Sequence, residues 1–109
     1  MLLLVLTGLC ACRGRLPAAQ FEQARGLIAN DCATCHVVPG ISRARGRVGP
    51  SLAGIARQQI IAGHFANTPD TMVRWIEHPQ AMLPGDAMPE MGLSREQAQA
   101  ITNYLYTLE

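Results

Sequence analysis

The chain has 109 residues, a net charge of +1 and a hydrophobic fraction of 49%, and only 5% of its residues are aromatic. This length fits one domain, and the balanced charge argues against non-specific nucleic-acid binding. A composition rich in Ala, Leu, Ile and Met favours small helices around a flat ligand over a β-sandwich, so we expect an all-α protein.

Residues 1–12 resemble an export leader. An apolar run over residues 1–11 is similar to the hydrophobic segment of a secretory signal and is about half as long as a bilayer-spanning helix. Leu9-Cys10-Ala11-Cys12 resembles a bacterial lipobox, in which Cys12 would be lipidated after cleavage. Lipid anchoring, simple cleavage and a truncated anchor remain alternatives, and each places the chain outside the cytoplasm. Residues 13–19 would then form a tether and residues 20–109 the domain.

A first helix is predicted after Pro17, because apolar residues from Phe21 to Ile28 recur with helical spacing. This helix should end by presenting Cys32, the first residue of the motif Cys32-Ala33-Thr34-Cys35-His36. Cys-x-x-Cys-His is the pattern of covalent c-type haem attachment. Residues i and i+3 share one face of a helical turn, so both sulfurs can reach one porphyrin edge, with His36 as the proximal iron ligand.

Two other chemistries use a Cys-x-x-Cys pair. A zinc site would need two further ligands at suitable spacing, and only scattered histidines are available in this sequence. A dithiol oxidoreductase would be expected within a βαβ pattern, which is absent. Haem attachment is therefore the preferred interpretation.

The middle of the chain combines loops with one amphipathic helix. Arg43, Arg45 and Arg47 alternate in a Gly- and Pro-rich loop over residues 37–48, which we interpret as solvated; a patch that steers an acidic redox partner is the alternative. Residues 49–54 form a turn into a short helix, and no strand pattern is found. Thr68-Pro69 predicts the start of a helix that stops before Pro79.

That helix should bury one face, formed by Met72, Trp75 and Ile76. Residues 79–92 contain so many Pro and Gly residues that we expect a loop without regular structure.

The last helix has the clearest sequence signals. Ser94 and Gln97 form a capping box, and Leu93 can pack on Ala98 as a hydrophobic staple. Apolar residues recur at helical spacing from there to Leu108. The apolar face of this helix is predicted to pack on the first helix.

Four stretches occur in the order found in class I cytochromes c, which residues 20–109 resemble as a whole. They are residues 32–36, 48–52, 75–79 and 83–89, namely Cys-Ala-Thr-Cys-His, Val-Gly-Pro-Ser-Leu, Trp-Ile-Glu-His-Pro and Leu-Pro-Gly-Asp-Ala-Met-Pro. The resemblance is closest to small bacterial cytochromes and to fused haem domains of terminal oxidases. It implies a cytochrome c fold, with three to five short helices wrapped around one covalent haem c and the terminal helices packed together.

The resemblance also implies roles for individual residues. Met88 would supply the sixth iron ligand, and the carbonyl of Pro50 would accept a hydrogen bond from Nδ1 of His36. Trp75 would be a buried aromatic beside the haem, and Tyr104 would pack on the first helix. The implied cofactor-binding residues are Cys32, Cys35, His36, Pro50, Arg57, Asn67, Trp75 and Met88, with Arg57, Asn67 and Trp75 as candidates for polar contacts to propionates or pocket waters.

Other side chains compete for the sixth position on the iron. Met82 and Met91 are alternative thioethers, although only Met88 lies in a Pro-Gly-x-x-Met-Pro context. Bis-histidine ligation would use His64 or His78, which we interpret as surface or pocket-rim groups.

One departure from the family pattern concerns the first helix. Ala24 stands eight residues before Cys32, where the family usually has a glycine, and Gly26 follows two residues later.

These observations predict a one-electron carrier, not an enzyme, working on the periplasmic side as a monomer or as part of a complex. Its expected partners are redox proteins, namely a terminal oxidase, a quinol-oxidising complex or a dehydrogenase, and no nucleic acid. A permanent haem subunit of an oxidase or dehydrogenase complex is the alternative. A further alternative is a haem sensor or peroxidase, in which Met88 dissociates from the iron and opens it to a ligand.

Overall fold

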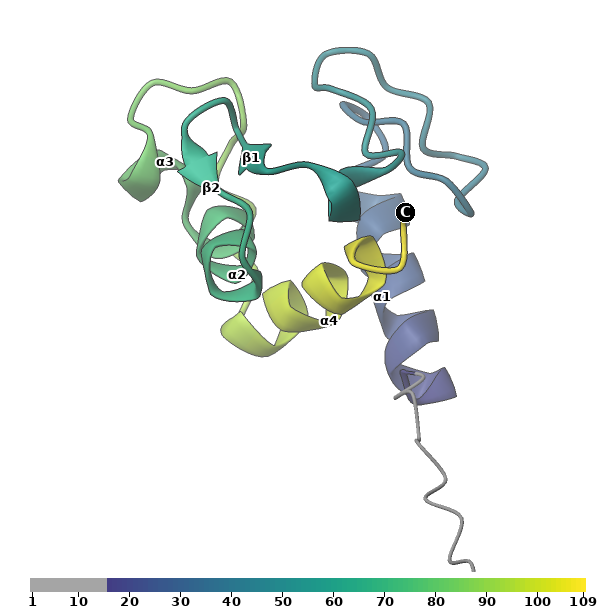
Figure 1. Ribbon diagram of the computed structural model, residues 1–109. Coiled ribbons are helices and arrows are strands. Elements are labelled where there is room, and N and C mark those ends of the chain that lie inside the picture. The colour runs from purple at the N-terminus through teal and green to yellow at the C-terminus, as the bar shows by residue number, and fades with distance from the viewer. Residues whose placement is uncertain (1–15) are drawn as a thin grey trace, which may run out of the picture.

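The computed structural model describes residues 16–109. The predicted leader, the lipidation of Cys12 and the first part of the tether lie outside the described residues. In chain order the elements are α1 (Ala18–Asp31), η1 (Ile55–Arg57), β1 (Ile60–Ile61), β2 (Phe65–Ala66), α2 (Pro69–Glu77), α3 (Pro79–Met82) and α4 (Arg95–Leu105) (Figure 1). None of the helices within this part of the chain is both long enough and apolar enough to span a bilayer.

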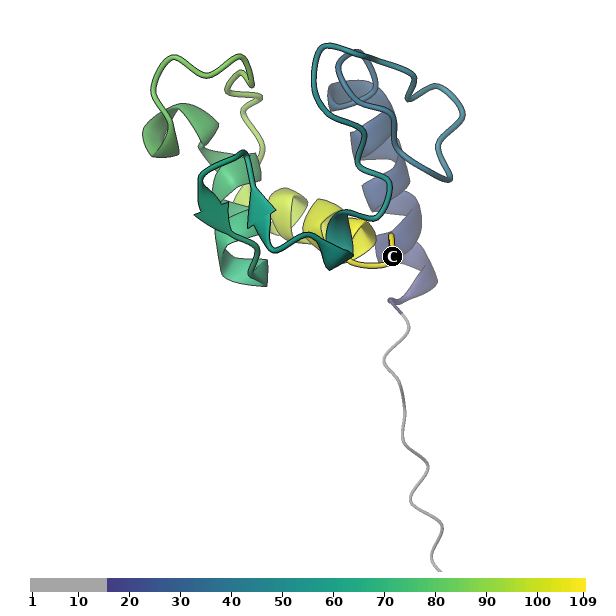
Figure 2. The ribbon, with the colours of Figure 1, turned by 45° about the horizontal axis from the view of Figure 1, so that its top comes forward.

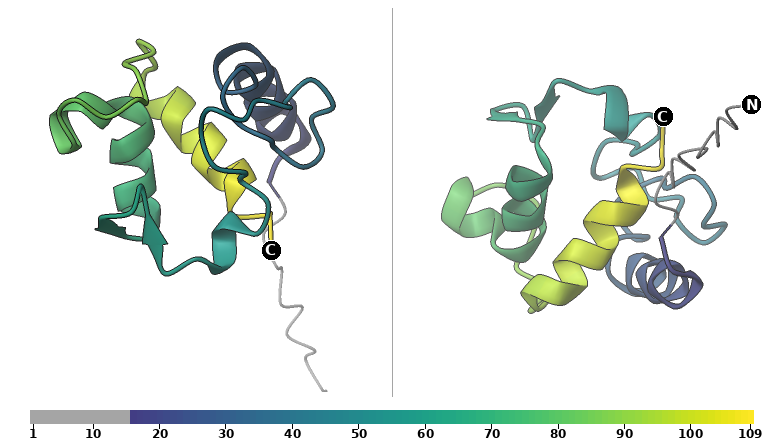
Figure 3. Two further views of the ribbon diagram at one scale, coloured as in Figure 1. Left: turned by 90° about the horizontal axis from the view of Figure 1, so that it is seen from above. Right: turned by 60° about the horizontal axis from the view of Figure 1, so that its bottom comes forward.

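Helix α4 joins the two sides of the fold. It packs against both α1 and α2, with α1 on one side and α2, α3 and the strands on the other (Figure 2). Seen from above, the loop that follows α1 and the segment that leads into the strands close a ring of elements together with α1, α2 and α4 (Figure 3). The predicted helical fold with packed first and last helices is confirmed.

Helix α1 follows the prediction closely. Its buried positions include Ala24 and Ile28, both with no exposed surface, and it ends where the Cys32 N–H donates to the Ile28 carbonyl at 2.9 Å. The Phe21 and Tyr104 rings pack at a centroid distance of 5.1 Å, which confirms the aromatic contact between α1 and α4.

The glycine near the middle of α1 has no part in the crossing of the helices. A Cβ at Gly26 would have no other heavy atom within 4 Å, and this residue is exposed. The small, fully buried residue on this helix is Ala24, at the position where the family usually has glycine.

Both predicted helix starts near the centre and end of the domain are confirmed. Thr68 caps α2 by accepting a hydrogen bond from the Thr71 N–H at 3.2 Å. The capping box of α4 is complete, since the Ser94 Oγ accepts from the Gln97 N–H at 3.1 Å and the Gln97 Oε1 accepts from the Ser94 N–H at 2.9 Å. The predicted inner face of α2, formed by Met72, Trp75 and Ile76, is buried.

Three details of the secondary structure differ from the predictions. Residues Pro79–Met82 form the short helix α3 where a loop was expected, because proline fits the first turn of a helix, where its missing N–H needs no partner. Strands β1 and β2 form an antiparallel pair of two residues each, too short to leave an alternating pattern in the sequence. Helix α4 ends at Leu105, so Leu108 lies beyond it, where its carbonyl accepts from the Ala56 N–H at 3.0 Å.

A buried hydroxyl in α4 allows a test of the packing. The Oγ1 of Thr102, which is 1% exposed, has no hydrogen-bond partner among the described residues. We expect Thr102→Val to raise the free energy of unfolding by about 1 kcal/mol, because an unpaired buried polar group costs ~1–3 kcal/mol. Denaturant unfolding of the holoprotein measures this change.

Thr107→Val is the matched comparison. The Thr107 Oγ1 donates to the Tyr104 carbonyl at 2.6 Å, so this substitution removes a hydrogen bond that is present and should lower stability by ~0.5–1.5 kcal/mol. A Thr102→Val variant as destabilised as Thr107→Val would contradict the expectation.

Candidate functional site

A cavity of about 580 Å³ lies at the centre of the ring of elements. This volume is within the range of ~300–1,000 Å³ that is usual for small-molecule sites. The wall is mainly apolar and is formed by the end of α1, residues 48–52, the segment from η1 to the strands, α2, residues 86–91 and α4. The cavity therefore suits a large, flat, mostly apolar ligand.

The turn after α1 brings the predicted attachment residues to this wall. The Cys35 and His36 N–H groups both donate to the Cys32 carbonyl, at 3.2 and 3.0 Å. As a result, Cys32, Cys35 and His36 all line the cavity, and both thiols are free of any disulfide. Burial raises the pKa of the Cys32 thiol to about 11, with smaller contributions from the nearby charges of Asp31 and Cys35. At neutral pH this sulfur is therefore held as an uncharged group.

The His36 ring is held in place from two directions. Its Nδ1 lies 2.6 Å from the Pro50 carbonyl, the hydrogen bond that the resemblance implied. Gly49 packs against the ring so closely that a Cβ there would lie 2.8 Å from Nδ1 and 2.9 Å from Nε2. The Gly49 N–H also donates to the Cys35 carbonyl at 2.7 Å. With Nδ1 bound to a carbonyl, Nε2 is the nitrogen left to bind a metal ion.

Methionines line the cavity from the other side of the fold. Met88 lies in the loop between α3 and α4, where its N–H donates to the Asp86 Oδ2 at 3.1 Å. Met91 lines the same cavity, whereas Met82 does not. Met72, on α2, is a third lining thioether. The helical spacing of the sequence predicts it only as part of the packed face of that helix. Met82 is therefore absent from the cavity wall, and Met72, Met88 and Met91 are the methionines of the described residues that line it.

Not all predicted site residues meet at the cavity. Pro50 and Trp75 line it, but Arg57 and Asn67 do not. The Asn67 Nδ2 donates to the Ile55 and Gln58 carbonyls at 2.9 and 2.8 Å. Asn67 therefore ties the strand pair to η1 rather than facing the ligand space.

The amide oxygen of Asn67 is bound by a residue at the end of α4. The Tyr106 hydroxyl donates to the Asn67 Oδ1, and desolvation raises the pKa of this phenol. Arg57 is exposed at the end of η1. The polar residue that does line the cavity here is Gln58, directly after Arg57, and its sequence context carried no signal that distinguished the two.

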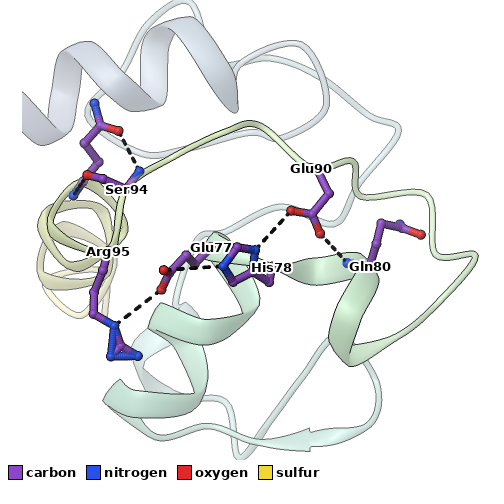
Figure 4. Close-up of polar contacts among 7 residues, drawn as sticks. Glu77, His78, Gln80, Glu90, Ser94 and Arg95 are labelled. Carbon is purple, nitrogen blue, oxygen red and sulfur yellow. Dashed lines mark hydrogen bonds and ion pairs between the residues drawn. The ribbon is translucent and has the colours of Figure 1, made fainter.

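The two further histidines lie away from the cavity. His64 is exposed, and His78 ends α2 with its ring near the carboxylates of Glu77, at 3.5 Å, and Glu90, at 3.4 Å (Figure 4). His36 is thus the only histidine of the described residues that lines the cavity. Residues 16–109 also contain no group of three His, Cys, Asp or Glu side chains able to hold a metal ion, so the zinc alternative has no ligand set there.

A helical fold around an apolar cavity, with a Cys-x-x-Cys-His turn in its wall, defines a class of small haem-binding proteins. The family described as Cytochrome c matches residues 21–109, and the chain belongs to this family. Membership implies a covalently bound haem c and a role in electron transfer.

Two kinds of relatives are found. The chain is 32% identical to cytochrome c oxidase subunit 2 of Alkalihalophilus pseudofirmus over 73% of its length, and 27% identical to cytochrome c oxidase subunit 2 of a Bacillus species over 81%. These matches cover 23% and 26% of the two subunits, so the chain spans about a quarter of their length. It is also 30% identical to cytochrome c2 of Rhodopila globiformis, over 88% of this chain and all of that protein.

Proposed function

We propose that this chain is a one-electron carrier with a single haem c, attached through Cys32 and Cys35 and ligated by His36 and Met88. The observation that carries the proposal is the His36 ring, fixed at the cavity wall by the Pro50 carbonyl at 2.6 Å. When bound, the haem supplies an iron that gains and loses one electron.

The residues of the cavity fit such a group. Two thiols and an imidazole lie on one turn of the wall, thioethers come from the facing loop and from α2, and the remaining lining is mainly apolar. Apolar residues exclude water, and fixed ligands limit the rearrangement that accompanies a change of charge. A thioether from Met88 would favour the reduced form more than a second imidazole and so raise the potential.

Exposed apolar residues support a free carrier more than a permanent subunit. Among the described residues, the large exposed hydrophobics are Val37, Val48 and Ile60, with 38%, 75% and 50% of their surface accessible. Val48 and Ile60 also line the cavity, whereas Val37 does not, so most of this exposed apolar surface lies at the cavity mouth rather than on a separate face. Transient docking of redox partners through small interfaces at this mouth is the arrangement we propose.

The proposed partners are a terminal oxidase, a quinol-oxidising complex or a dehydrogenase, met on the periplasmic side. The similarity to part of two cytochrome c oxidase subunits supports an oxidase and also favours the alternative, a haem module within such a complex. Arg43, Arg45 and Arg47 are all exposed and could steer an acidic partner. Export with a cleaved or lipidated leader, with Cys12 as the lipid site, completes the proposal.

The test of the proposed ligation is Met88→Ala in protein matured with its haem. We expect the low-spin His/Met spectrum to be lost while the haem stays covalently attached, because the thiols and His36 are untouched. Met91→Ala, which removes the other thioether near this loop, is the matched control and should keep the spectrum. An unchanged spectrum in Met88→Ala would show that another residue supplies the sixth iron ligand.

Carbon monoxide separates the carrier from a sensor or peroxidase. Reduced wild-type protein at neutral pH should not bind it, since both axial positions are filled in the proposed carrier. Binding in the wild type would favour the sensor or peroxidase alternative.

A further inference from the structure

The loop that carries Met88 has little structure of its own. Residues 83–90 contain two prolines and a glycine, and Gly85 adopts a positive φ of 86°. Within the described chain, the backbone of residues 84–90 makes one backbone hydrogen bond, from the Asp86 N–H to the Leu83 carbonyl at 3.1 Å. Side chains must therefore hold this loop in place.

One side chain, that of Gln80 on α3, holds most of the loop. Its Nε2 donates to the Asp86 carbonyl at 2.7 Å and to the Met88 carbonyl at 2.9 Å. Its Oε1 accepts from the Gly85 N–H at 3.0 Å. The side-chain amide of Gln80 thus uses its nitrogen and its oxygen in hydrogen bonds to the loop backbone. One of these bonds is made to the carbonyl of Met88 itself.

The main chain of Gln80 fixes the far end of the same loop. The Glu90 Oε1 accepts from the Gln80 N–H at 3.0 Å, while its Oε2 lies 3.4 Å from Nδ1 of His78 (Figure 4). Gln80 therefore contacts the chain on both sides of Met88.

The helix under Gln80 is itself well supported. Pro79 at its start is fully buried. Next to it, Glu77 pairs with Arg95 of α4 at 3.5 Å (Figure 4). Gln80 therefore connects the loop to the packed helices α2 and α4, which also form part of the cavity wall.

We propose that Gln80 is the positioning residue for Met88, holding the loop so that the thioether stays at the cavity. This inference rests on the proposed function, in which Met88 is an iron ligand. Without the Gln80 amide, three hydrogen bonds to residues 85–88 are lost, and the loop opens more often. The thioether then leaves the iron more often, without any change in the ligand itself.

The experiment uses Gln80→Leu in the oxidised holoprotein and measures the rate of cyanide binding, which requires Met88 to leave. We expect binding to be about tenfold faster than in the wild type, equivalent to about 1.4 kcal/mol. The far-red charge-transfer band of methionine bound to ferric haem should weaken as well. Hydrogen exchange at the Gly85 amide, whose acceptor is the Gln80 Oε1, should also become faster by about tenfold or more.

Gln80→Glu is a second variant of nearly the same shape. It keeps an acceptor for Gly85 but replaces the amide donor with an oxygen facing the Asp86 and Met88 carbonyls. Cyanide binding should be at least as fast as in Gln80→Leu, whereas exchange of the Gly85 amide should stay closer to the wild-type rate. Gln23→Leu, an exposed glutamine on α1, is the control and should change neither rate.

The outcomes separate the two proposals. If Met88→Ala changes the spectrum but both Gln80 variants bind cyanide at the wild-type rate, the role of Gln80 is overturned and the ligation stands. If Met88→Ala leaves the spectrum intact, the ligation fails, and with it the role of Gln80. A faster rate in both Gln80 variants, with Gln23→Leu unchanged, supports the proposal.

Discussion

Gly49→Ala is expected to disrupt the proximal side of the site. A Cβ at this position would lie 2.8 Å from Nδ1 and 2.9 Å from Nε2 of His36, and would lie closer still to Cε1. Real side-chain carbons do not approach a ring so closely, so either the imidazole or the backbone must move. The ring cannot move freely because Nδ1 is bound to the Pro50 carbonyl at 2.6 Å.

Movement of the backbone is no easier. The Gly49 N–H is committed to the Cys35 carbonyl at 2.7 Å, next to the attachment turn. Overpacking a well-filled site costs ~1–3 kcal/mol, and here the strain falls on the proposed iron ligand. We therefore expect a lower yield of holoprotein, a ferric spectrum that is no longer purely low-spin and a free energy of unfolding lower by about 2–3 kcal/mol.

Gly26→Ala is the matched control for the same chemical change. Gly26 lies within α1, and a Cβ there meets nothing within 4 Å. Replacing a mid-helix glycine with alanine should stabilise the fold by ~0.5–1 kcal/mol and leave the spectrum unchanged. Wild-type spectra and stability in Gly49→Ala would show that the glycine is not required beside His36.

Features encoded by neighbouring residues could be predicted from the sequence. The capping box of Ser94 and Gln97, and the Thr68-Pro69 start of α2, each depend on residues within one helical turn, and the structure contains both. The family pattern extended this to two long-range contacts, the hydrogen bond between His36 and Pro50 and the packing of Tyr104 on α1. Pro50 was found because it follows a recognisable motif, not because its distance from His36 along the chain indicated a contact.

Features that depend on the path of the chain in space could not be predicted. Asn67 has an amide that would suit a propionate, but the fold directs its hydrogen bonds to the Ile55 and Gln58 carbonyls. Gln80 lies in a segment predicted to be an irregular loop, and a glutamine there carries no signal until α3 places its amide against residues 85–88. Both side chains satisfy backbone groups in loops, and such groups leave no periodic pattern in a sequence.

Cys35→Ser tests the attachment of the haem most directly. When a haem is attached, each thiol adds across one vinyl group, with the sulfur bound to one carbon and the hydrogen to the other. Cys32 and Cys35 lie on one turn at the cavity wall, so the proposal requires one thioether from each. The variant should therefore keep at most one thioether, and its alkaline pyridine spectrum should shift to longer wavelength because one vinyl group remains conjugated.

Cys32→Ser should give the reciprocal single attachment, and the double variant should lose its haem on denaturation and solvent extraction. The mass of the denatured protein distinguishes retained from extracted haem. Thr34→Ser, at an exposed position between the two cysteines, is the control and should keep both thioethers. Normal double attachment in Cys35→Ser would exclude Cys35 from the site, and the assignment of the haem to this turn would fail with it.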